Sequence, residues 1–134
     1  MTLDYENILG ESEEQGETKH LQEMARIGNV GTFLISVFSD EGPTPHFHFM
    51  NTKTGAQGCI KILECSYFKH GKYQAELNSG ERKEIQQFLE KQTFDEIYRD
   101  GTTNFKVICH EWNKNNPEHT IGIDTKLPDY RKLQ

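Results

Sequence analysis

The apolar positions of the chain change their spacing near residue 78. Before it, β-branched and aromatic residues form short runs separated by Gly, Pro, Asp and Asn, which is typical of strands joined by turns. We expect strands at about 32 to 38, 46 to 51 and 57 to 64. The connections SDEGPTP and TKTGA are short enough for antiparallel hairpins, so the strands should form a meander. A weaker pair, CSYFKH and YQAEL, would add a further hairpin.

After residue 78 the apolar positions follow a helical period. Asn78 and Glu81 have the spacing of a capping box, and Ile85, Phe88 and Leu89 then share one helical face. The sequence therefore predicts an amphipathic helix that begins at Asn78.

A second helix is predicted in NFKVICHEWNKNNP. Phe105, Ile108, Cys109 and Trp112 fall at i, i+3, i+4 and i+7, and Pro117 ends the pattern. This order, with the strands before the helices, predicts an α+β fold. We expect a small antiparallel sheet of three or four strands, followed by two amphipathic helices that pack on one face of the sheet. We also expect one helical turn in 93–101 and one short strand at 121–124.

Strand alternation predicts which side chains of HFHFM face the core. Phe47 and Phe49 should point inward, whereas His46, His48 and Met50 should point to the opposite face, either solvated or under a loop. The expected core combines side chains from the strands and from both helices: Phe33, Ile35, Val37, Phe47, Phe49, Ile60, Ile62, Phe88, Leu89, Phe105, Ile108 and Trp112.

Charge divides the chain into unequal parts. Residues 1–19 hold six acids and one lysine, and so carry −5 of the formal net charge of −6. We expect a flexible acidic arm at 1–20, one α+β domain at 22–125 and a polar tail at 126–134. The alternative for the arm is a segment that folds on a basic partner.

Composition excludes several classes of function. The pI of about 5.5 and the absence of a basic cluster argue against nucleic acid as a ligand. The longest apolar run, at 32–38, is too short to cross a bilayer, and no apolar leader begins the chain, so we expect a cytoplasmic protein. Cys59, Cys65 and Cys109 lack CxxC spacing, which leaves their role open and indicates no disulfide framework.

The candidate chemistry lies in the pair His46 and His48. Imidazoles at i and i+2 share a strand face about 6.5 to 7 Å apart and can converge on one zinc ion. A third ligand is not specified by the sequence, and the candidates are Asp40, Glu41, His70 and His110. The alternative, which we prefer, needs no cofactor: hydrogen-bonded histidines that order a hairpin or form a binding surface with Met50.

The stretches ARIGNVGTFLISVFSDEGPTPHFHF and CIKILECSYFKHGKYQAELNSGERKEIQQFLE resemble the bacterial domain of unknown function 4160 over about residues 23–91. The most specific element is PHFHF placed after FSD. The chain differs from the family in having PTP where two adjacent prolines are usual, and in its C-terminal extension from residue 94. The resemblance implies a small cytoplasmic protein of a toxin–antitoxin-like or mobile-element gene pair.

Two functions follow from these observations. The preferred one is a non-catalytic interaction module that holds a protein partner, basic and encoded nearby, through the histidine face and the acidic arm. The alternative is a divalent-metal-dependent phosphoester hydrolase with His46 and His48 as ligands and Asp40 or Glu41 as third ligand or base. The hydrolase requires a third ligand within about 5 Å of both imidazoles, beside an open pocket.

Overall fold

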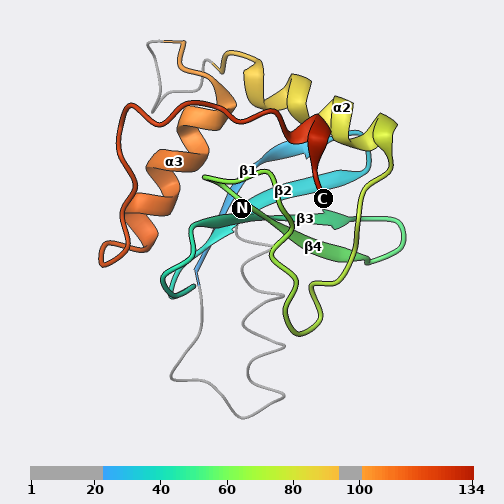
Figure 1. Cartoon of the computed structure of the whole chain (residues 1–134), viewed down its shortest axis with the longest axis horizontal. Coiled ribbons are helices and arrows are strands. Elements are labelled where there is room, and N and C mark those ends of the chain that lie inside the picture. The colour runs from blue at the N-terminus through green and yellow to red at the C-terminus, as the bar shows by residue number, and fades with distance from the viewer. Residues whose placement is uncertain (1–22, 94–100) are drawn as a thin grey trace.

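The computed structural model describes residues 23–93 and 101–134 of the chain. Within them, four antiparallel strands form one sheet whose spatial order equals the sequence order, as expected for a meander (Figure 1). The strands are β1 (Met24–Val30), β2 (Phe33–Phe38), β3 (His46–Asn51) and β4 (Gln57–Lys61). The expected acidic arm at 1–20 and most of the helical turn at 93–101 lie outside the described residues.

β1 is the strand that the hydrophobic pattern did not predict. Its sequence MARIGNV contains Gly28 and Asn29, residue types that are depleted in strands, and its register against β2 shifts between Arg26 and Gly28. A Cβ atom at Gly28 would lie 2.9 Å from the Phe88 ring. The glycine therefore lets a helix approach the sheet closely, at the expense of the strand signal.

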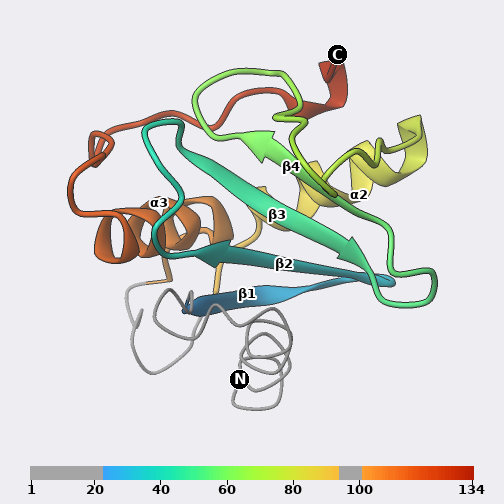
Figure 2. The same cartoon turned by 90° about the horizontal axis from the view of Figure 1, so that it is seen from below.

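Two helices cover one face of the sheet, as the turned view shows (Figure 2). Helix α2 (Ser79–Glu90) has the predicted capping box, in which Asn78 and Glu81 each accept the other's backbone N–H at 2.8 Å. Helix α3 (Asn104–Asn115) begins after the N-cap Thr103. The predicted α+β fold is confirmed. Neither helix is long and apolar enough to span a bilayer, and the same holds for every helix of the described residues.

The core lies between the helices and the sheet. Of the predicted core side chains all are buried except Phe88, which is partly buried against the others. The other face of the sheet carries a smaller apolar group: Met24, Leu34 and Phe38, with Met50 packed against them.

The segment 66–75 covers the outer edge of β4. Phe68 N–H donates to Cys59 O and Ala75 N–H donates to Gln57 O, both at 2.9 Å. A Cβ atom at Gly58 would lie 2.3 Å from the Phe49 ring and 2.7 Å from Ala75 O, so this close approach needs glycine. The hairpin expected here is reduced to isolated bridges, and β4 ends at Lys61 instead of continuing to 64.

The C-terminal segment is part of the core. In the short 3-10 helix η2 (Tyr130–Lys132), Tyr130 is fully buried, and its hydroxyl donates to Ile62 O at 2.7 Å. Gln86 of α2 accepts the Tyr130 N–H at 2.9 Å, and Leu133 is also buried. The prediction that 126–134 is a polar tail outside the domain is therefore wrong, and 121–124 contain no strand but a turn at 123–124.

Candidate functional site

The two histidines of β3 are buried side by side. His46 and His48 are 1% and 4% exposed, and their ring centroids lie 5.1 Å apart. Their neighbours in the strand, Phe47 and Phe49, belong to the core on the helix-covered face. The predicted alternation of β3 is confirmed, and of the two environments expected for the histidines the structure has the covered one.

Aromatic side chains from distant segments enclose this pair. Phe68 and Tyr73, from the segment that covers β4, meet His46 and His48 at centroid distances of 4.8 and 4.7 Å. Trp112 of α3 lies 5.5 Å from His46. The rings leave the imidazoles little contact with solvent.

The predicted binding surface of His46, His48 and Met50 is therefore not accessible. Both imidazoles are buried, and Met50 is half-buried against an apolar group. Alternation placed the three side chains on one face correctly, but it holds no information about the segment 66–75, which folds back over that face.

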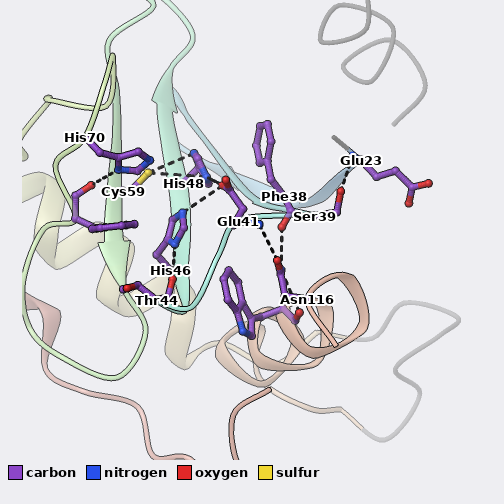
Figure 3. Close-up of polar contacts among 12 residues, drawn as sticks. Glu23, Phe38, Ser39, Glu41, Thr44, His46, His48, Cys59, His70 and Asn116 are labelled. Carbon is purple, nitrogen blue, oxygen red and sulfur yellow. Dashed lines mark hydrogen bonds and ion pairs between the residues drawn. The ribbon is translucent and has the colours of Figure 1, made fainter. Parts of the chain in front are cut away.

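Glu41 is the third member of the site. Its Oε1 lies 3.2 Å from His46 Nε2 and also contacts His48 Nε2 directly (Figure 3). The Glu41 side chain is only 12% exposed. Of the two acids considered from the sequence, Asp40 is exposed, whereas Glu41 reaches both imidazoles. Glu41 Oε1 is thus an oxygen atom within reach of both histidines, as the metal hypothesis requires.

The loop before β3 aims Glu41 inward. Asp40 and Gly42 on either side have φ of 56° and 78°, so the chain turns sharply around Glu41. Asn116 Oδ1 accepts the Glu41 N–H at 3.0 Å, and the Asn116 amide donates to Phe38 O at 3.0 Å. Asn116, the C-cap of α3, thus ties this loop to the end of β2. Asn116 is not among the site residues predicted from the sequence; a polar residue just before the helix-ending Pro117 was the available signal.

The protonation of His46 follows from its contacts. Its Nδ1 lies 2.7 Å from Thr44 O, and because a carbonyl oxygen only accepts, Nδ1 carries a proton. Its Nε2 atom faces Glu41 Oε1 at 3.2 Å. A histidine that donates from Nδ1 to a backbone carbonyl and offers Nε2 is the usual arrangement of metal-ligating imidazoles.

Burial and the neighbouring charges set the ionisation of the cluster. Burial alone would raise the pKa of Glu41, but hydrogen bonds from His46 and His48 and their charges outweigh it and hold this pKa far below 4.5. Burial lowers the pKa of His48 below 6.5 against the opposing effect of Glu41. At neutral pH, neutral His48 therefore donates from Nε2 to ionised Glu41.

Cys59 is the fourth side chain at the site and was left without a role by the sequence. It pairs with His48 across β3 and β4, and its Sγ lies 3.4 Å from His48 Nδ1. Burial, and then the charge of Glu41, raise the pKa of Cys59, which makes it a thiol that donates to Nδ1. His46, His48 and Cys59 each offer one possible metal-ligand atom, and these atoms all lie within 4.8 Å of one another.

The remaining candidate ligands divide between the site and the surface. The ring centroid of His70 lies 5.7 Å from that of His46, and His70 Nδ1 lies 3.0 Å from Phe68 O (Figure 3). His110 is on the exposed side of α3. The structure brings His46, His48, Glu41, Cys59 and His70 together.

Comparisons with sequence models of protein families, with curated proteins and with solved structures found no match. The resemblance to the domain of unknown function 4160 stays a prediction.

Proposed function

We propose that the protein is a small non-catalytic module that binds a transition-metal dication such as Zn²⁺ through Glu41, His46 and His48. One observation carries this proposal: a single carboxylate oxygen, Glu41 Oε1, lies against the Nε2 atoms of both histidines. Imidazole nitrogen and carboxylate oxygen are ordinary zinc ligands.

The distance between Glu41 and His46 fits a shared ion. Ligand atoms bound at about 2.0 to 2.2 Å in a tetrahedral zinc site lie about 3.3 Å from one another. Glu41 Oε1 and His46 Nε2 are 3.2 Å apart. A dication between them would replace the protons that otherwise join Glu41 to the two imidazoles, so metal binding would release protons.

Burial favours a structural metal over a catalytic one. Catalytic zinc keeps one coordination position open to water or substrate. Here His46 and His48 are buried, and Glu41 exposes 12% of its side chain. The hydrolase alternative has its third ligand, but the covering rings disfavour substrate access. A metal in this place would fasten the loop 39–45 onto β3 and stabilise the fold.

An interaction role for this module stays a proposal of its own. A basic protein partner encoded nearby, the cytoplasmic location and the part played by the acidic arm are predictions from the sequence. With the histidine face covered, a partner would have to meet another surface.

The test is thermal unfolding of the full chain after chelator treatment, with and without Zn²⁺. A ligand that binds only the folded state at about 100 times its Kd adds about 2.7 kcal/mol, so Tm should rise by several degrees. The double variant His46→Gln/His48→Gln should show no rise.

A His110→Gln variant is the matched control because it removes an exposed histidine of α3. It should keep the full response to Zn²⁺. Equal responses of the wild type and the double variant, or no response in the wild type, would refute the proposal. Native mass spectrometry of protein purified without chelator would report the bound ion directly.

A further inference from the structure

Cys59 lies beside His48, one of the proposed metal ligands. The antiparallel register sets it opposite His48, and both side chains are buried. Its Sγ is 3.9 Å from His48 Nε2, the nitrogen that faces Glu41. In a tetrahedral site with metal–nitrogen bonds of about 2.0 Å and metal–sulfur bonds of about 2.3 Å, these two atoms would be about 3.5 Å apart. Sγ now lies nearer to His48 Nδ1, at 3.4 Å, so the imidazole ring has to turn before Nε2 and Sγ can bind one ion.

Charge gives a physical reason for sulfur at this place. A dication bound by Glu41 and two neutral imidazoles would leave one net positive charge in a buried site. An uncompensated buried charge is costly, whereas a Cys59 thiolate brings the net charge of ion and ligands to zero. The covering aromatic rings make this compensation more important, because they exclude the water that would otherwise screen the charge.

His70 is the competing fourth ligand. Its Nδ1 contacts Phe68 O at 3.0 Å, which leaves Nε2 as a free electron-pair donor in the neutral tautomer. Its ring centroid lies 5.7 Å from that of His46 (Figure 3). A neutral imidazole, however, would leave the net positive charge of the site in place.

We infer that Cys59, as a thiolate, is the fourth ligand of the ion held by Glu41, His46 and His48. A ligand set of two nitrogens, one oxygen and one sulfur selects borderline-soft ions such as Zn²⁺ and Co²⁺ over Mg²⁺ and Ca²⁺. On binding, the S–H bond breaks, the proton leaves to solvent and a sulfur electron pair forms the bond to the metal. The inference rests on the proposed metal-binding function.

The test is a titration of the full chain with Co²⁺ followed by absorption spectroscopy. Visible d–d bands report that cobalt is bound, and a near-ultraviolet charge-transfer band reports a thiolate ligand. The wild type should show both. Cys59→Ser should keep d–d bands and lose the charge-transfer band, whereas Cys65→Ser and His70→Gln should keep both.

Each other outcome is informative. Visible bands without a charge-transfer band in the wild type, or a charge-transfer band that persists in Cys59→Ser, would overturn the inference and leave the metal-binding proposal standing. No cobalt spectrum at all would overturn both. If Cys59→Ser does not fold, X-ray absorption at the zinc edge of the wild-type protein tests the assignment instead. We expect one sulfur atom among the zinc ligands, and a spectrum without a sulfur ligand would refute the assignment. Excess Mg²⁺ or Ca²⁺ should not displace Co²⁺, and displacement would contradict the selectivity.

Discussion

His48 has a hydrogen-bond partner on each side. Its Nε2 meets the carboxylate of Glu41, and its Nδ1 lies 3.4 Å from the thiol of Cys59. Without metal, these contacts satisfy the polar atoms of a buried ring, and His46 Nε2 lies 3.2 Å from the same Glu41 oxygen. The proposed metal site would use the same side chains as this hydrogen-bonded network.

The proton-linked form should lose stability as the pH falls from about 7 to about 4. The pKa of His48 is lowered from 6.5, so the unfolded chain takes up this proton first. The pKa of Glu41 is lowered from 4.5, so here too the unfolded chain is protonated first. Each proton adds a slope of at most about 1.4 kcal/mol per pH unit.

Urea denaturation at a series of pH values, with chelator present, measures this dependence. His48→Gln should remove the slope that begins near pH 6.5, and His110→Gln should retain it. A His48→Gln profile parallel to that of the wild type would show that His48 does not cause the dependence.

At the scale of elements, the C-terminal end of α3 organises the site. Asn116 caps the helix through the Trp112 carbonyl and also holds Phe38 O and the Glu41 N–H. These contacts join the helix end, the end of β2 and the loop that carries Glu41. For the proposed ion, Asn116 would be a positioning residue, because its contact is with the Glu41 backbone and not with the ion.

Asn116→Ala should therefore weaken metal binding as well as stability. The loss of buried hydrogen-bond partners should cost about 1 to 3 kcal/mol. The affinity for Zn²⁺ should fall in addition, because Glu41 loses its anchor. Isothermal titration with Zn²⁺ and urea denaturation separate the two effects.

Asn113→Ala is the matched control. Asn113, one turn earlier on α3, exchanges two hydrogen bonds with the backbone of Ile121. Its loss should reduce stability and leave the Zn²⁺ affinity unchanged. An equal loss of affinity in both variants would mean that α3 affects the site only through general stability.

At the scale of the whole molecule, the C-terminal segment closes the core. Tyr130 packs edge-on against Phe47, with ring centroids 5.7 Å apart, and its hydroxyl holds the Ile62 carbonyl after β4. Gln86 binds its backbone N–H. Strand, helix and C-terminal segment thus meet at one side chain.

Tyr130→Ala should destabilise the protein by about 3 to 5 kcal/mol, as for other buried aromatic side chains. Tyr130→Phe keeps the ring and should cost about 1 to 3 kcal/mol, because the Ile62 carbonyl loses its donor. Truncation after residue 125 should be at least as harmful as Tyr130→Ala. Urea denaturation measures all three, and a truncated chain of unchanged stability would mean that the segment is a dispensable tail.

The sequence alone determined the features that depend on near neighbours along the chain. The capping box of α2, the buried face of α3 and the alternation of Phe47 and Phe49 with the histidines were all predictable, because hydrogen bonds and side-chain direction at those places are local. The strand missed was β1, where Gly28 serves contact with a helix far along the chain and weakens the local signal.

Tertiary structure decided the composition of the site and the place of the C-terminus. Glu41 and not Asp40 reaches the histidines because the backbone of Asp40 and Gly42 is left-handed. The Glu41 N–H is also held by Asn116, 75 positions away in the sequence. Cys59 joins His48 only through strand register, and Tyr130 reaches Ile62 across 68 positions. Contacts at such separations follow from how the elements pack together, and no spacing along the chain contains that information.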